Sequence, residues 1–158
     1  MPKQRPHASK QDYETPDDLI AAVEKRFGKL GIDLAATKKN AKAPQFITPE
    51  QDSLNTPWSE SIDGRNAWLN PPFKDITPWA SKCATHALFL GPDCGTRIFF
   101  LTPASVGSNW FAEHVFDKAL VLFLSPRLMF KGASDPYPKD VILSVFGEKP
   151  GFELWRWR

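Results

Sequence analysis

Two consecutive prolines stiffen the loop that leaves a short apolar run near the centre of the chain. The run covers residues 67–69 (Ala-Trp-Leu), and the loop reads Asn70, Pro71, Pro72, Phe73. Each proline fixes its own φ at about −65° and restricts the residue before it to extended conformations. The backbone of Asn70 and Pro71 is therefore held extended without help from tertiary contacts, at the end of an expected strand.

This loop presents one amide side chain, backbone carbonyl groups and one aromatic ring. Such a set suits a flat substrate that carries an NH2 group: the Asn70 side-chain oxygen and the Pro71 carbonyl can accept its two hydrogens, while Phe73 stacks on its ring. Acceptance of both hydrogens makes the nitrogen lone pair a better nucleophile. A polyproline turn that only caps a strand is the alternative for these four residues.

The composition predicts one globular domain. The chain has 158 residues, of which 42% are hydrophobic, and it has no apolar run long enough to span a membrane. Residues 1–12 are polar and basic, so we expect a flexible basic arm there, followed by a single domain over 13–158, in a cytoplasmic protein. The two cysteines form no C-x-x-C pair, so we predict no metal site. A net charge of +2 permits a polyanionic partner.

Helices are predicted where a threonine precedes a proline. Thr15 has the properties of an N-cap, Pro16 those of a first helical residue, and an apolar stripe runs from there to Phe27. The same pair recurs at Thr77 and Pro78, which predicts a second long helix. A third helix is expected over 109–114.

Apolar runs alternate with these helices. We predict strands over 31–36, 66–69, 97–101 and 119–124, mostly parallel to one another. The last two runs, 141–146 and 152–157, flank a Gly-Glu-Lys-Pro-Gly turn and predict an antiparallel C-terminal hairpin that closes the sheet. The fold class is therefore α/β, with an open sheet.

Four motifs in order resemble those of a known family. Asn-Pro-Pro-Phe resembles the [D/N/S]-P-P-[Y/F] catalytic loop of S-adenosylmethionine-dependent amino-methyltransferases. Y-x-T-P at 13–16 resembles a methionine-binding motif, D-x-A-A at 33–36 a cofactor loop without its usual G-x-G half, and D-S-L at 52–54 a slot near the cofactor adenine. Together with P-R-L-x-F at 126–130, the set resembles the short, Dam-like phage-type DNA N6-adenine methyltransferase family.

The resemblance implies a Rossmann-like methyltransferase fold and an enzyme that flips adenine out of DNA and methylates its amine directly, without a metal. Asn70 and Pro71 would hold the amine, Pro72 would stiffen the loop and Phe73 would stack on the base. Arg127 and residues 105–109 are candidates for the DNA side. S-adenosyl-L-methionine would be contacted by Tyr13, Thr15, Pro16, Asp33, Ala35 and Asp52.

Two other functions fit parts of the pattern. A methyltransferase acting on a protein glutamine amide uses the same loop chemistry, although it normally keeps the G-x-G loop. A nucleic-acid-binding module with a dead cofactor site would use the basic arm and the tryptophans. For the DNA enzyme, we expect that a separate recognition domain of normal size does not fit in 158 residues. Specificity is then short and loop-borne, relaxed, or supplied by a homodimer or a separate partner.

A near-copy of the catalytic tetrapeptide occurs at 135–137 (Asp-Pro-Tyr). It lacks one proline and lies in a polar loop before the last pair of strands. We therefore expect it to form a turn, or a loop that touches the target strand, and not the catalytic loop.

Overall fold

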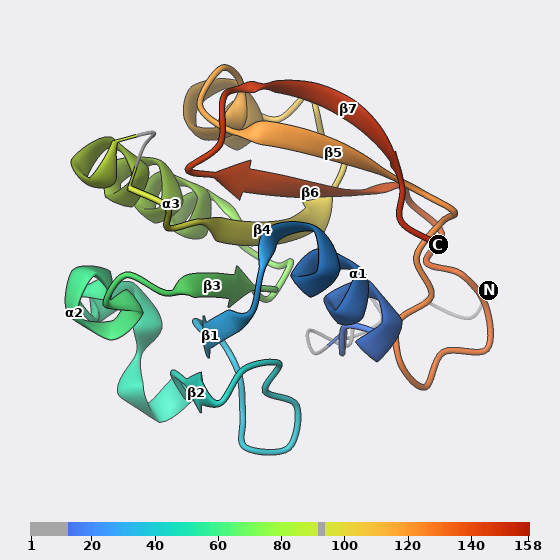
Figure 1. Ribbon diagram of the computed structural model, residues 1–158. Helices are drawn as coiled ribbons and strands as arrows, with labels where there is room; N and C mark the ends of the chain where they lie inside the picture. The colour runs from blue at the N-terminus through green and yellow to red at the C-terminus, as the bar shows by residue number, and fades with distance from the viewer. Residues whose placement is uncertain (1–12, 92–93) are drawn as a thin grey trace, which may run out of the picture.

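The computed structural model describes residues 13–91 and 94–158. The described residues form a seven-stranded sheet in the order β2-β1-β3-β4-β6-β5-β7 (Figure 1). The predicted basic arm, residues 1–12, lies outside the described residues. The mixed α/β class expected from the sequence is confirmed.

The strands and helices alternate along most of the chain. The helical segments are α1 (Asp17–Phe27), α2 (Trp58–Ile62), α3 (Thr77–Leu90), the π-helix η3 (Phe111–Val115) and two short 3-10 turns, η1 (Pro49–Gln51) and η2 (Ser53–Asn55). The strands are β1 (Leu30–Asp33), β2 (Gln45–Phe46), β3 (Asn66–Leu69), β4 (Ile98–Pro103), β5 (Leu120–Ser125), β6 (Val141–Phe146) and β7 (Gly151–Arg156).

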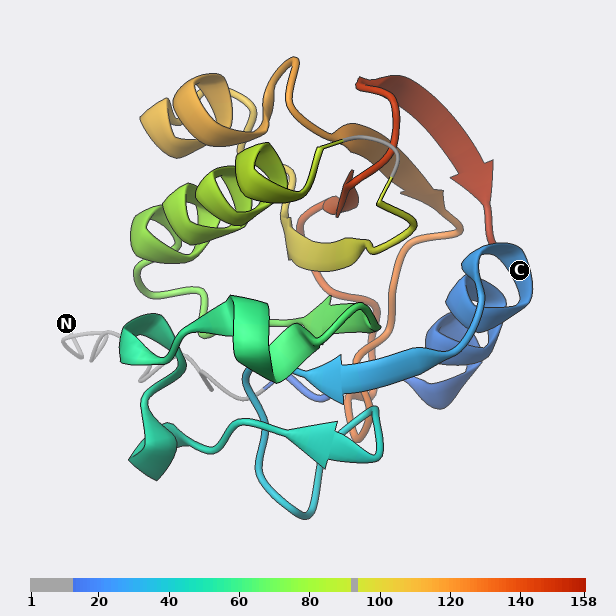
Figure 2. The same ribbon diagram turned by 60° about the vertical axis from the view of Figure 1, so that its left-hand side comes forward.

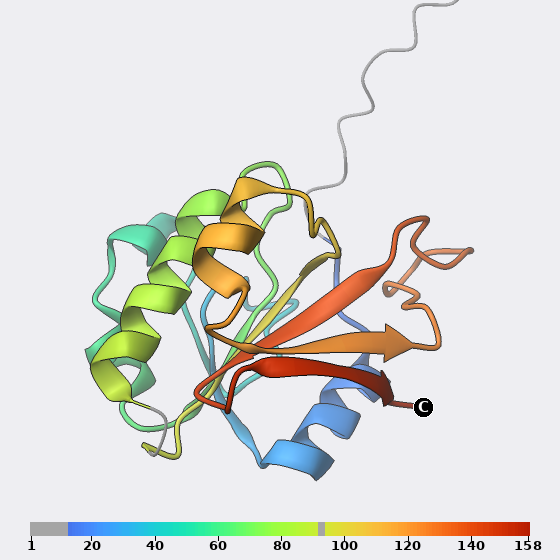
Figure 3. The ribbon, with the colours of Figure 1, turned by 90° about the horizontal axis from the view of Figure 1, so that it is seen from above.

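Helices cover both faces of the sheet, and β4 shows how. Successive side chains of a strand point to opposite faces of the sheet. All six residues of β4 are buried because both faces are covered. Ile98 and Phe100 pack in the cluster that includes α2, α3 and η3, whereas Phe99 and Leu101 pack in the cluster that includes α1. Figure 3 shows α3 and η3 on one side of the sheet and α1 on the other. Each face therefore has its own apolar core.

The strands that carry the predicted site are parallel neighbours. β1 pairs in parallel with β2 and β3, and β3 pairs in parallel with β4. Their carboxyl ends consequently meet at one edge of the sheet, which is where α/β proteins bind ligands. Asp33 ends β1 and Asn70 follows β3, so the two residues lie at this edge.

The predicted C-terminal hairpin is wrong. We expected 141–146 and 152–157 to pair with each other, but β5 lies between β6 and β7, antiparallel to β6 and parallel to β7. The short link 147–150 passes the start of β5, where the Gly151 N–H donates to the Ala119 carbonyl at 3.3 Å. The turn residues reveal that the chain reverses direction. The position of β5 between β6 and β7 depends on pairing between residues far apart in the sequence, and local sequence patterns do not predict such pairing.

The predicted threonine N-caps are also wrong, although both helices exist. The N-cap position of α1 is Pro16 and that of α3 is Ile76, and neither helix has a side-chain cap. Thr15 instead contacts another loop through its hydroxyl group. Its role therefore belongs to the site and not to helix capping.

The C-terminal strand lies beside α1. Arg26 of the helix pairs with Glu153 at 2.6 Å, and Asp18 pairs with Arg158 at 2.8 Å. Figure 2 shows the end of β7 next to the helix. Among the described residues, no helix is long and apolar enough to cross a membrane.

Candidate active site

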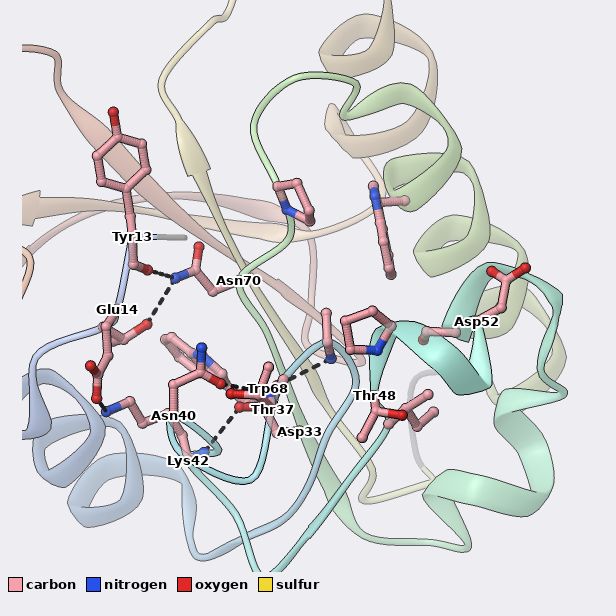
Figure 4. Close-up of a pocket in the computed structure, with 18 residues that line it drawn as sticks. Tyr13, Glu14, Asp33, Thr37, Asn40, Lys42, Thr48, Asp52, Trp68 and Asn70 are labelled. Atoms are coloured by element: carbon pink, nitrogen blue, oxygen red, sulfur yellow. Dashed lines mark hydrogen bonds and ion pairs between the residues drawn. The ribbon is translucent and has the colours of Figure 1, made fainter. Parts of the chain in front are cut away.

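The Asn70 side chain makes two hydrogen bonds to the segment before α1. Its Nδ2 donates to the Tyr13 carbonyl at 2.5 Å and to Thr15 Oγ1 at 3.1 Å (Figure 4). A carbonyl oxygen can only accept a hydrogen bond, so the NH2 end of the amide must face Tyr13. No described residue donates a hydrogen bond to Asn70 Oδ1. Among the described residues, this oxygen is therefore an acceptor without a donor.

An aromatic cluster of Tyr13, Phe73, Phe130 and Tyr137 surrounds the other end of the loop. The Tyr13 ring stacks on Phe73 with 5.6 Å between centroids and an angle of 28°. Phe130 and Tyr137 lie 5.1 and 5.3 Å from the Tyr13 ring. These contacts fix the Phe73 ring, and they also hold the residue whose carbonyl binds Asn70.

The Asp33 carboxylate is buried at the end of β1, with 3% of the residue exposed. Its Oδ1 accepts from the Ala35 N–H at 3.2 Å and its Oδ2 from the Lys42 N–H at 3.0 Å. Burial raises the pKa of Asp33 to about 6, although the two backbone hydrogen bonds and the Lys42 charge oppose the rise. The carboxylate thus closes the loop after β1 and places a titratable negative charge at the site.

Ion pairs join three segments around this loop. Lys42 Nζ lies 3.2 Å from Glu14 and 3.0 Å from Asp17, and only 8% of the Lys42 side chain is exposed. Lys131 contacts the same two carboxylates at 3.5 and 3.3 Å. Hydrogen bonding from Lys42 is the main reason that the pKa of Asp17 is lowered. The segment before α1 is therefore tied both to the loop after β1 and to the loop between β5 and β6.

A first cavity opens at the carboxyl edge of β1 and β3. In Figure 4, Tyr13 and Asn70 lie on one side of it and Asp52 on the opposite side. The lining side chains include Tyr13, Glu14, Thr15, Asp33, Ala35, Asn40, Lys42, Thr48, Asp52, Trp68, Asn70, Pro72 and Trp79.

A second cavity lies on the Phe73 side of the same loop. Its wall includes Tyr13, Phe73, Ser105, Ser108, Trp110, Tyr137 and Lys139. Tyr13 lines both cavities, so they adjoin at the residue whose carbonyl holds Asn70. The loop therefore presents its amide to the first cavity and its aromatic ring to the second.

Comparison with known proteins identifies the family. A family model described as DNA N-6-adenine-methyltransferase (Dam) matches residues 3–142. The chain belongs to this family. It is 27% identical over 146 residues to the DNA N-6-adenine-methyltransferase of Escherichia phage T1, covering 92% of this chain and 58% of that relative. It is 31% identical over 133 residues to the Haemophilus phage HP1 protein of the same name, covering 82% of this chain and 72% of that one.

Most of the residues assigned to the cofactor in this Dam-family chain line the first cavity. Tyr13, Thr15, Asp33, Ala35 and Asp52 do so, as do Asn70 and Pro72 of the loop. Pro16 is not in the wall and occupies the N-cap position of α1. Pro71 is buried and is in the wall of neither cavity. The roles of these residues stay predictions.

The residues expected on the DNA side separate in the structure. Ser105 and Ser108 line the second cavity. Arg127 lines neither cavity and pairs with Asp140 at 3.2 Å. Tyr137, from the near-copy of the catalytic motif, is part of the second cavity. The expectation that this loop approaches the target strand therefore stays open, with its aromatic ring beside Phe73.

Sequence patterns missed several wall residues of the first cavity. Asn40 and Lys42 belong to a polar loop that carries none of the four motifs, and Trp68 and Trp79 lie within β3 and α3. The hydrogen bond from the Lys42 N–H to Asp33 closes the nine-residue loop onto the cavity. The acidic residue at the end of β1 was the only local signal for this closure. In the described part of the chain, no group of three or more His, Cys, Asp or Glu is arranged to hold a metal ion.

Proposed function

We propose that the chain is a DNA adenine methyltransferase that transfers a methyl group from S-adenosyl-L-methionine to the N6 amine of adenine in DNA. The observation that carries this proposal is the Asn70 amide. Its NH2 end is bound by two acceptors, and no described residue donates a hydrogen bond to its oxygen. Asn70 lines the first cavity together with Tyr13, which lines both cavities. The names of the phage relatives support the same activity.

The arrangement of the sheet supports a Rossmann-like methyltransferase fold. Strands β1, β3 and β4 are parallel, and β6 runs antiparallel between β4 and β5. The ligand cavity opens at the carboxyl ends of the parallel strands, as it does in open α/β sheets generally.

The residues of the first cavity fit S-adenosyl-L-methionine. The indole Nε1 of Trp68 is buried and has no hydrogen-bond partner among the described residues, so an acceptor on a ligand would satisfy it. Burial makes ionisation of Asp33 costly, and a cation nearby would reduce that cost. The cofactor has carboxylate and hydroxyl oxygens as well as ammonium and sulfonium cations. It therefore offers a partner to both residues.

When bound, the cofactor supplies a methyl group activated by the adjacent sulfonium. The chain contributes acceptors: Asn70 Oδ1 and the Pro71 carbonyl would each accept one hydrogen of the adenine amine. Both bonds strengthen as positive charge develops on that nitrogen, so they stabilise the transition state more than the bound substrate. Transfer would form the N–C bond at the adenine amine at the expense of the C–S bond, and the extra proton of the methylated amine would pass to water.

The second cavity is proposed to hold the target adenine, flipped out of the duplex. Phe73 would stack on the purine ring, because the aromatic cluster already holds this ring in place. Ser105 lies in the same wall, and its hydroxyl group could bind the base or its sugar, whereas Ser108 Oγ already donates to the Ser105 carbonyl at 2.6 Å. Dimerisation, a separate specificity partner and a cytoplasmic location stay predictions.

Incubation with labelled S-adenosyl-L-methionine and unmethylated DNA, followed by nucleoside analysis, tests the proposal. We expect N6-methyladenine. Label found only in N4-methylcytosine, or only in protein, would contradict it. Asn70→Ala should abolish most of the transfer, and Asn66→Ala is the matched control, because Asn66 begins β3, the strand that Asn70 follows, and its amide contacts the Phe27 carbonyl instead.

A further inference from the structure

Two oxygen atoms face the nitrogen of the Asn70 amide, and they determine which side chain can serve at this position. We propose that Thr15 and the Tyr13 carbonyl form an acceptor pair that makes asparagine obligatory at residue 70, with Thr15 as a positioning residue. Aspartate, which opens the same motif in other amino-methyltransferases, would not substitute here. This inference rests on the proposed role of Asn70 in holding the adenine amine.

The side-chain hydrogen bond of Thr15 is the one that it makes to Asn70. Thr15 is 2% exposed, its side chain does not cap α1, and its Oγ1 accepts from Asn70 Nδ2 at 3.1 Å. A 180° turn of the amide would remove the hydrogen bond to the Tyr13 carbonyl, and the Thr15 hydroxyl would have to reverse and donate to Oδ1. It would also bring Oδ1 against the Tyr13 carbonyl oxygen. The acceptor pair therefore selects the orientation in which Oδ1 is free.

The Tyr13 carbonyl is held in place on both sides. The Tyr13 ring packs in the aromatic cluster, with Phe73, Phe130 and Tyr137 around it. The next carbonyl along the chain, that of Glu14, accepts from the Lys131 N–H at 2.9 Å. The segment is thus bound to the loop between β5 and β6 and cannot retreat freely from a repulsive partner.

An ionised aspartate at position 70 would have no proton to offer this pair. The Thr15 hydroxyl can reverse and donate, but a backbone carbonyl cannot. One carboxylate oxygen would then lie about where Nδ2 now lies, 2.5 Å from the Tyr13 oxygen, with no hydrogen between them. The carboxylate must either rotate away from the productive geometry or bind a proton. Protonation restores a donor, so the aspartate variant should recover as the pH falls.

Single-turnover methylation of DNA at saturating S-adenosyl-L-methionine tests the acceptor pair in Asn70→Asp and Asn70→Ala. At pH 8 we expect both variants to be slower than the unchanged protein by about 100-fold or more. Relative to the unchanged protein at each pH, Asn70→Asp should speed up between pH 8 and pH 6, whereas Asn70→Ala should not. An Asn70→Asp rate within tenfold of normal at pH 8, or a ratio that does not change with pH, would overturn the inference.

Thr15→Val and Thr15→Ser test the positioning role. Valine keeps the shape and removes the acceptor, so we expect the rate to fall about 3- to 10-fold, the range for one neutral hydrogen bond. Because Thr15 also lines the first cavity, the rate is measured at saturating S-adenosyl-L-methionine, so that a change in cofactor affinity does not affect it. Thr15→Ser keeps the hydroxyl and should be faster than Thr15→Val by a similar factor. Equal rates in the two variants, with both folded by circular dichroism, would overturn the role of the hydroxyl.

The two proposals fail in different ways. If Asn70→Ala transfers methyl groups at a near-normal rate, the role of Asn70 under the proposed function is wrong. If Asn70→Ala is slow and Asn70→Asp is fast at pH 8, Asn70 still holds the amine and only the requirement for asparagine is wrong.

Discussion

The two cavities that meet at Tyr13 are held by different forces. The walls of the first are fixed by hydrogen bonds and ion pairs: Asp33 accepts two backbone N–H groups, and Lys42 bridges Glu14 and Asp17. The second is bordered by aromatic rings, with Phe73 packed against Tyr13 and Tyr137. Charged and hydrogen-bonded groups hold the walls of the first cavity, whereas packing between aromatic rings holds those of the second.

This difference matches the two proposed ligands. A cationic cofactor is best held by a buried carboxylate, whereas a neutral base is best held by a flat aromatic surface. Substitutions in one cavity should therefore affect one ligand and leave the other nearly unchanged. Asn70 contacts Tyr13, which borders both cavities, but its substitution is expected to slow the chemical step and to leave the binding of the cofactor nearly unchanged.

The largest effect on cofactor affinity is expected from Asp33→Ala. Loss of this carboxylate should weaken S-adenosyl-L-methionine binding by about 1.5–3 kcal/mol, the range for a hydrogen bond to a charged group. Asp52→Ala is the matched control: its carboxylate is exposed at the other side of the cavity, so the loss should be smaller. Calorimetric titration measures both. An unchanged affinity in folded Asp33→Ala would place the cofactor elsewhere.

Phe73→Ala should act on the other cavity. Removal of the ring should weaken engagement of a flipped adenine by about 1–3 kcal/mol, as for other lost base-stacking contacts. Affinity for the cofactor should hardly change. DNA binding is measured with a duplex that carries a mismatch at the target adenine, in the presence of S-adenosylhomocysteine. Equal weakening of cofactor and DNA binding would show that the cavities are not independent.

Acid should weaken the cofactor site selectively. Because the pKa of Asp33 is raised to about 6, the carboxyl group binds a proton in the free protein as the pH falls through 6. A cationic ligand favours the ionised form, so its binding must release that proton. We expect S-adenosyl-L-methionine affinity to fall about tenfold between pH 7 and pH 5. Asp33→Asn should flatten this dependence, and a flat profile in the unchanged protein would contradict the charge pairing.

Local sequence patterns predicted the loop at 70–73 and the strands around it, because these depend on neighbouring residues in the chain. Two prolines define the loop at 70–73 wherever it lies in the fold, and the apolar runs identify β3, β4 and β6. The hydrogen bond between Thr15 and Asn70 was not predicted, because a Thr-Pro pair looks the same in the sequence whether its hydroxyl caps a helix or binds a side chain 55 residues away. Lys42 escaped because a lysine in a polar loop gives no sign that its backbone N–H closes onto Asp33.

The central claim is that Asn70 serves the chemical step and not the binding of the cofactor. Single-turnover methylation of Asn70→Ala, measured beside a calorimetric titration with S-adenosyl-L-methionine, tests it most directly. We predict a rate lower by about 10²–10³ and a nearly unchanged dissociation constant, because Pro71 and Pro72 still hold the loop. A near-normal rate, or a loss of cofactor affinity that accounts for the slower reaction, would contradict the claim.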